Sequence, residues 1–208
     1  MIVVNFKTYS EATGEDAEKL AEACSKAAEA TGEEVIVAPS PYDLGTDARE
    51  FAQHVDPVEP GSHTGHVLAE GVVKAGASGT LLNHSERRME KEDIESSLER
   101  ARENDLEVVI CAQSPEECEE LSALGPDYVA YEPPELIGGE TAVSDARPGL
   151  IEEAVEKSEV PVLTGAGIKD AKDVEKSIEL GCEGVLVASG VVKAENPEEA
   201  VRELCSGL

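Results

Sequence analysis

The sequence predicts an α/β fold in which eight short strands alternate with helices. Runs rich in Val, Ile and Leu recur along the whole chain, and most are separated by polar segments with helical periodicity. Aromatic residues make up only 3% of the chain, so aliphatic side chains must form the interior, which suits strands buried on both faces. No Ser/Gly-rich linker or change in composition divides the chain. We therefore expect one domain, residues 1–208, built as a closed (β/α)8 barrel or as an open doubly wound sheet.

The elements follow one another in a regular order. The expected strands are the apolar runs at 2–6, 35–38, 52–55, 80–83, 107–111, 128–131, 161–164 and 184–188. The expected helices are the amphipathic stretches at 15–30, 90–104, 114–124, 146–158, 170–181 and 197–206. Ser114 and Asn196 each precede a proline, which is typical of a capping side chain before a first-turn proline. The patterns are least distinct at the third strand and around 40–50.

The composition is strongly acidic, with 45 Asp and Glu residues against 17 Lys and Arg and a formal net charge of −28. Such a surface repels nucleic acid and anionic membranes, so neither is expected as a partner. We also expect no membrane span and no signal peptide, because no apolar run is long enough and the N-terminus lacks a basic region. Because salt screens self-repulsion, the charge predicts a protein adapted to high intracellular salt.

The five cysteines are odd in number and include no Cys-x-x-Cys pair. This pattern favours small buried thiols in a reducing compartment over disulfides or a metal site. A cytoplasmic location is therefore expected.

Polar residues cluster directly after the expected strands, and this clustering favours the barrel over the open sheet. Five such groups follow strands one, four, six, seven and eight: Asn5 with Lys7, Asn83-His84-Ser85-Glu86, Glu132, Gly165-Ala166-Gly167 and Ala188-Ser189-Gly190. In a barrel all five converge on the carboxyl-terminal face, where such enzymes have their active sites. The two glycine-containing turns would present backbone N–H groups to a phosphate.

The segment 128–139 carries the most informative of these groups. Its β-branched and aromatic start places Glu132 at the end of a buried strand, and the two prolines that follow end that strand. The Leu-Ile-Gly-Gly tip supplies an apolar loop with permissive backbone, which is typical of a lid beside an acid or base. Taken alone, the segment is equally consistent with a surface glutamate and an ordinary turn.

Single members of the set have simpler explanations. Lys7 alone is explained by any of the many carboxylates, and His84 alone is typical of a hydrogen-bonded structural histidine. The run from Gly165 begins like a dinucleotide fingerprint, but Asp170 replaces its last glycine. The segment 54–66 contains scattered metal-ligand types whose spacing fits no closed site well. The prediction of an active site therefore depends on the whole set.

Three motifs together resemble the triosephosphate isomerase family. They are Asn5-Phe6-Lys7, Asn83-His84-Ser85-Glu86-Arg87-Arg88 and Tyr131-Glu132-Pro133-Pro134-Glu135-Leu136-Ile137-Gly138. The resemblance continues through 165–168 and 184–190, so it runs the full length. It is closest to the short archaeal branch, whose lid begins Pro-Pro-Glu. It implies a single closed TIM barrel, and because the chain is shorter than the ~250 residues typical of that fold, we expect a reduced helical layer after the second and fourth strands.

The resemblance also implies a reaction, the interconversion of dihydroxyacetone phosphate and D-glyceraldehyde 3-phosphate through an enediolate, with no metal or organic cofactor. By position, the family's established roles fall on Glu132 as the base and on His84 as the neutral imidazole that polarises the carbonyl. Lys7 would balance the charge of enediolate and phosphate, and Asn5 would hydrogen-bond a substrate oxygen. Ser85 would open a helix whose dipole disfavours the imidazolium.

Further residues are implied around these four. Glu86 would support the histidine, and the substrate or its phosphate would contact Phe6, Lys7, Ile137, Gly167, Ala188 and Ser189. The tip Gly138-Gly139-Glu140 departs from the Gly-Thr-Gly of many relatives and brings a carboxylate towards an anionic substrate. High salt would weaken that repulsion.

Self-association is implied as well. The loop Gly61-Ser62-His63-Thr64-Gly65 would dock into a neighbouring subunit, where Thr64 would approach Asn5. A homotetramer is expected from the archaeal relatives, with a dimer left open. The implied role is in glycolysis and gluconeogenesis.

Two other functions stay open from the sequence. Another phosphate-binding barrel, such as a sugar-phosphate epimerase or isomerase, would share the two phosphate turns, but would not explain Lys7, His84 and Glu132 together. A non-catalytic phosphosugar-binding barrel would gain nothing from a base beneath a lid.

Overall fold

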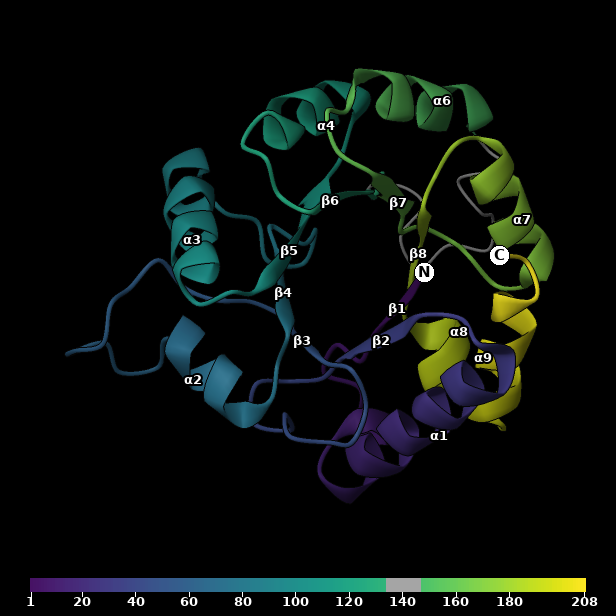
Figure 1. Ribbon diagram of the computed structural model, residues 1–208, viewed down its shortest axis with the longest axis horizontal. Coiled ribbons are helices and arrows are strands. Elements are labelled where there is room, and N and C mark those ends of the chain that lie inside the picture. Colours follow the sequence, from purple (N-terminus) through teal and green to yellow (C-terminus); the bar gives the residue numbers. More distant parts are fainter. Residues whose placement is uncertain (134–146) are drawn as a thin grey trace.

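The computed structural model describes residues 1–133 and 147–208, and its strands form one parallel sheet in the order β2-β1-β8-β7-β6-β5-β4-β3. The strands are β1 Ile2–Asn5, β2 Val35–Ala38, β3 Phe51–Ala52, β4 Gly79–Leu82, β5 Glu107–Ala112, β6 Tyr128–Tyr131, β7 Val162–Thr164 and β8 Gly184–Val187. A parallel bridge between Val37 and Glu50 joins β2 to β3 and closes the ring (Figure 1). The closed (β/α)8 barrel is therefore confirmed over the open sheet.

The core is divided by the sheet into an inner and an outer part. Successive side chains of β1 alternate between them: Val3 packs inside the barrel, whereas Ile2 and Val4 face the helices. The inner cluster is mainly aliphatic and consists of Val3, Ile36, Ala38, Phe51, Leu81, Val109, Cys111, Ala130, Leu163 and Leu186. A barrel filled in this way is a solid support for groups at its rim.

Helices surround the ring of strands (Figure 1). They are α1 Glu15–Thr31, α2 Ala69–Ala75, α3 Lys91–Glu103, α4 Pro115–Ser122, α6 Pro148–Lys157, α7 Ala171–Glu179, α8 Ser189–Val192 and α9 Pro197–Cys205, with a short 3₁₀ turn η1 at Ser10–Ala12. The two predicted caps are confirmed: Ser114 accepts from the N–H of Glu117, and Asn196 accepts from the N–H of Glu199. None of the helices in the described ranges has both the length and the apolar composition that crossing a membrane requires.

The third strand is shorter and earlier than predicted. It ends at Ala52, and Gln53 then uses its side-chain amide to bond the carbonyls of Lys7 and Ala38. After Ala52, the contact with the neighbouring strands is made by this side-chain amide and not by backbone hydrogen bonds. The apolar pattern of 52–55 does not reveal such a change. Helix α2 was not expected either, because it is short and contains a glycine.

The helical layer is reduced at one of the two expected places. No helix occurs between β2 and β3, where the described segment 39–50 joins the two strands. The buried carboxylate of Glu50 holds this segment by accepting from the N–H groups of Gly45 and Thr46 and from the Thr46 hydroxyl. The expectation of a thin layer after the fourth strand is wrong.

After β4 the chain instead forms the full helix α3. Its buried residues Ile94, Leu98 and Ala101 recur at helical spacing and pack in the outer core. Among the described residues, the connection from β2 to β3 is therefore a place where the helical layer is reduced, and the connection after β4 is not.

All five cysteines are free thiols, and all are buried. Cys111 lies inside the barrel, and the other four pack between sheet and helices. They serve as small apolar side chains in the positions that the sequence analysis indicated.

Candidate active site

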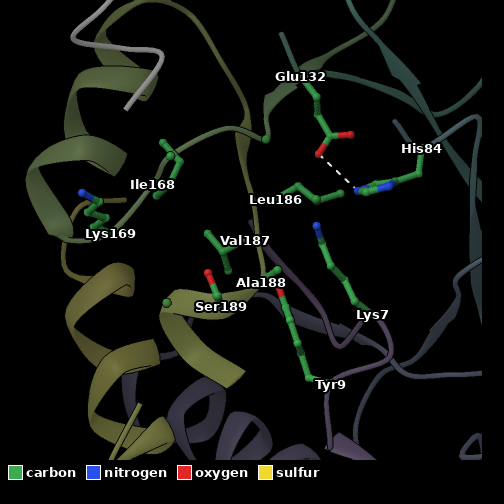
Figure 2. A pocket seen from close by; sticks show the side chains of 13 residues that line it. Lys7, Tyr9, His84, Glu132, Ile168, Lys169, Leu186, Val187, Ala188 and Ser189 are labelled. Carbon is green, nitrogen blue, oxygen red and sulfur yellow. Dashed lines mark ion pairs between the residues drawn. The ribbon is translucent and has the colours of Figure 1, made fainter. Parts of the chain in front are cut away.

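A cavity of about 320 Å³ opens at the carboxyl-terminal end of the strands (Figure 2). It is lined by Lys7, Tyr9, His84, Glu132, Gly165, Gly167, Ile168, Lys169, Leu186, Val187, Ala188, Ser189 and Gly190. Asn5 and Glu86 line an adjoining cavity of about 400 Å³, which shares Lys7, Tyr9 and His84 with the first. The five groups predicted from the strand ends are therefore brought together at one rim.

Glu132 is fixed at the end of β6, and its carboxylate is directed into the cavity. Its N–H donates to the Ala112 carbonyl at 2.8 Å, and its side chain is 2% exposed. A Cβ on Gly165 would lie 2.5 Å from Cγ of Glu132, so only glycine leaves room for this carboxylate. Within the described residues Oε2 has no hydrogen-bond partner. A buried, incompletely bonded carboxylate is typical of a group that acts on a ligand.

His84 faces Glu132 across the cavity. Its Nε2 lies 3.6 Å from Oε1 of Glu132, too far for a good hydrogen bond, and has no hydrogen-bond partner in the described ranges. Its Nδ1 accepts from the N–H of Glu86 at 3.2 Å. Because Nδ1 accepts, the proton of the neutral ring is on Nε2, the nitrogen that faces the cavity.

The site shifts these two groups in opposite directions. Burial raises the pKa of Glu132 to about 7, although a hydrogen bond from the Cys111 thiol and the charge of Lys7 oppose the rise. Burial also lowers the pKa of His84 to about 4, with Lys7 lowering it further and Glu86 opposing. At neutral pH the imidazole is therefore uncharged, while the carboxyl exchanges its proton readily.

No helix dipole is needed for the low pKa of His84, and the helix expected at Ser85 is not there. The chain forms a turn in which the N–H of Arg87 donates to the His84 carbonyl at 2.7 Å, and α3 begins only at Lys91. Desolvation and the nearby ammonium of Lys7 account for the direction of the shift.

Lys7 brings a positive charge to the side of the cavity where His84 lies. Its backbone has φ 49°, a left-handed conformation uncommon for lysine, and its N–H donates to Oδ1 of Asn5 at 2.9 Å. The side chain extends below the His84 imidazole, on the side away from Glu132 (Figure 2), and its ammonium is 3.0 Å from Oε1 of Glu86. Amine, imidazole and carboxyl therefore surround one space.

The other predicted site residues differ in their placement. Gly167, Ala188 and Ser189 line the cavity from the segments that follow β7 and β8. Ile137 and the tip 138–140 lie outside the described residues. Thr64 is exposed in the loop that follows β3.

Phe6 does not line the cavity. Its side chain is fully buried in the outer core beside β1 and α1, and its N–H donates to the Ala38 carbonyl. This placement contradicts a contact between the Phe6 side chain and a substrate, because the alternation of the chain after β1 turns it away from the rim.

The segment 54–66 forms no metal site. His54 bonds Asp56 at 3.1 Å, and the rings of His63 and His66 meet edge to face at 5.7 Å. Across the described ranges, no group of three or more His, Cys, Asp and Glu side chains is placed to hold a metal ion.

Tyr9 and Cys111 lie beside this set and were not predicted as site residues. Tyr9 lines both cavities, with the Lys193 ammonium 4.4 Å from the centre of its ring. Its place two residues after Lys7 was the available signal. Cys111 gives no such signal, because a thiol at the end of an apolar strand is indistinguishable from core.

Comparison with known proteins identifies the family. The family model described as triosephosphate isomerase matches residues 1–206. The chain belongs to the triosephosphate isomerase family. It is similar to the triosephosphate isomerase of Methanothermus fervidus, with 46% identity over all of this chain and 98% of that one, and to the triosephosphate isomerase of Methanopyrus kandleri, with 48% identity over 100% and 97%. Both are archaeal, as the sequence resemblance implied.

A solved triosephosphate isomerase structure, that of Bartonella henselae, shares the fold with a TM-score of 0.73. At 18% identity it covers 98% of this chain, with 96% of its own chain matched. Membership of the triosephosphate isomerase family makes the chain an isomerase and decides against the two alternative functions left open by the sequence.

Proposed function

We propose that the protein interconverts dihydroxyacetone phosphate and D-glyceraldehyde 3-phosphate with Glu132 as the base and His84 as the electrophile. The observation that carries the proposal is that the buried Glu132 carboxylate faces Nε2 of His84 at 3.6 Å, with the Lys7 side chain on the other side of the imidazole (Figure 2). Removing a proton from carbon beside a carbonyl needs a positioned base and donors for the developing oxyanion. Glu132 would be the base, and His84 and Lys7 would be the donors to the oxyanion.

In the proposed reaction Glu132 takes a proton from one substrate carbon and returns it to the neighbouring carbon. The Nε2–H of His84 donates to the carbonyl oxygen as negative charge develops there, and Lys7 balances that charge. Asn5, which already orients the Lys7 backbone, would also bond a substrate oxygen. A neutral imidazole is a suitable donor because the low pKa of His84 keeps it from holding a second proton.

The phosphate is proposed to bind opposite these groups. Gly167, Ala188 and Ser189 line that side of the cavity and would offer backbone N–H groups, with Ile137 contributing from the lid. A lid that grips phosphate would also exclude water from the enediolate, which otherwise loses phosphate. A coupled assay with glyceraldehyde 3-phosphate in molar potassium chloride tests the activity directly, and absence of turnover there would reject it.

The pH dependence of the reaction should reflect Glu132. Because its pKa is raised to about 7, kcat/KM is expected to fall as the pH drops through 7, where the carboxylate takes up a proton. His84, with its pKa near 4, should contribute no change between pH 6 and 9. The substrate phosphate itself titrates near pH 6, so a 13C NMR titration of the free enzyme is the control. A Glu132 carboxyl that titrates near its ordinary value would contradict the assignment.

We further propose that the protein is adapted to high salt. The support is its net charge of −28, which favours unfolding through self-repulsion unless ions screen it. The free energy of unfolding, measured by urea titration at several potassium chloride concentrations, is expected to rise from dilute buffer to molar salt. Equal or greater stability in dilute buffer would reject the adaptation.

The remaining assignments are proposals of the same kind. The chain is proposed to act as one domain, residues 1–208, in the cytoplasm, where reduced thiols persist. It is proposed to assemble as a homotetramer, or a dimer, with Thr64 of one subunit approaching Asn5 of another. A monomeric mass at working salt, with full activity, would contradict the assembly.

A further inference from the structure

Asn83, the residue directly before His84, has an unusual backbone conformation, and it is buried although its side chain is polar. Its φ is 59°, in the left-handed region, and the residue is 1% exposed. Asparagine tolerates this region better than other residues with a Cβ, but glycine tolerates it best. The amide side chain must therefore contribute something that glycine would not.

That contribution is a pair of hydrogen bonds that hold the chain on both sides of the turn. Nδ2 of Asn83 donates to the Cys111 carbonyl of β5 at 2.9 Å, and its Oδ1 accepts from the N–H of Met89 at 3.0 Å. The first bond ties the end of β4 to the neighbouring strand. The second closes the loop 83–89, so that one side chain fixes where the loop leaves the barrel and where it returns.

His84 and the N–H of Glu86, which determines its tautomer, both lie inside this closed loop. Arg88 adds a third contact by donating from Nη1 to the Asn83 carbonyl at 3.3 Å. The backbone of the loop is thus held from its first residue to its last. The orientation of the imidazole depends on that backbone, because the ring is bonded through Nδ1 to the loop itself.

We propose that Asn83 is a positioning residue that sets the orientation and tautomer of the His84 imidazole through the loop 83–89. The inference rests on the proposed role of His84 as electrophile. It predicts a specific kinetic pattern, because the proposed phosphate contacts Gly167 and Ser189 follow β7 and β8, whereas the bonds of Asn83 are to Cys111, Met89 and Arg88.

The test is Asn83→Gly, which preserves the left-handed backbone and removes both side-chain bonds. We expect kcat to fall by a factor on the order of 10 to 100, since small misplacement of a catalytic group has effects of that size. KM should stay within about twofold. The matched control is Asp105→Gly, which replaces another left-handed residue, φ 56°, exposed at the opposite end of the strands. It should leave both constants unchanged.

A spectroscopic measurement separates positioning from stability. In 15N NMR spectra of the parent at pH 7, His84 should show one neutral tautomer with the proton on Nε2, and Asn83→Gly should show a mixture of tautomers. Asn83→Asp retains the acceptor for Met89 but loses the donor to Cys111, so its kcat is expected to lie between those of the parent and the glycine variant.

Parent-like kcat and a single tautomer in Asn83→Gly would overturn the inference. Should Asn83→Gly fail to fold, the same two measurements on Asn83→Asp decide it. His84→Gln identifies a failure of the underlying function: if that variant turns over normally, the role of His84 is wrong. If it is slow while Asn83→Gly is normal, only the positioning role is wrong.

Discussion

Glu132→Asp is expected to lower kcat by a factor on the order of 10² or more, with little change in KM. The substitution keeps the carboxylate but retracts it by one methylene from the substrate carbon. The backbone has no freedom to compensate, because the N–H of Glu132 is bonded to β5 and the Gly165 N–H is bonded to the Tyr131 carbonyl. Steady-state kinetics in molar potassium chloride measure the effect. A kcat close to that of the parent would mean that another group is the base.

Glu132→Gln should abolish turnover and at the same time stabilise the folded protein at high pH. Because burial raises the pKa of Glu132 from 4.5 to about 7, the native state binds the proton more tightly than the unfolded state. Stability is therefore lost as the pH rises from about 4.5 to about 7, a loss on the order of 3 kcal/mol for a shift of this size. Glutamine does not ionise and escapes that loss.

The pH dependence of the stability difference between Glu132→Gln and the parent is the control for this effect. Urea unfolding at pH 8 should show Glu132→Gln more stable than the parent, and the difference should shrink steadily as the pH is lowered towards 4.5. An inactive variant with no gain at pH 8 would contradict the burial of an ionisable carboxyl, although not its role as base.

The convergence of the three proposed catalytic residues on one cavity was predictable because the barrel places the end of every strand at one rim. The separation in sequence from Lys7 to Glu132, with His84 between them, is 125 positions. Each of the three nevertheless follows an apolar run that is typical of a strand. Topology then brings them together without any local signal. The aliphatic core and the capped helices were predictable for a similar reason, since period and capping are local properties.

What the sequence did not reveal depends on contacts between distant segments. The helix expected after Ser85 is a turn because Asn83 bonds both Cys111 and Met89, and neither bond follows from local propensity. Gly165 looks like part of a phosphate turn, but a Cβ at this position would lie too close to the Glu132 side chain. The end of the third strand depends in the same way on side-chain bonds from Gln53.

Lys7→Ala is expected to lower kcat by a factor of about 10² to 10³ and to raise KM as well. The ammonium is the positive charge that extends towards His84, and an anionic substrate becomes more anionic at its oxygen as the enediolate forms. Alanine keeps a Cβ, so the left-handed backbone at φ 49° is not relieved by the change. Lys19→Ala is the matched control: it removes an equal charge whose ammonium is also 3.0 Å from a carboxylate, but on the exposed face of α1.

The same substitution should move the pH profile, because Lys7 holds down the pKa values of both Glu132 and His84. Its removal is expected to shift the acid limb of kcat/KM to higher pH, whereas Lys19→Ala should leave it in place. Glu86→Gln distinguishes substrate contact from ion pairing. Since the Glu86 carboxylate is 57% exposed, its pairing with Lys7 is screened by solvent and should matter little. If Glu86→Gln proved as damaging as Lys7→Ala, the ion pair and not the charge facing the substrate would be the important feature.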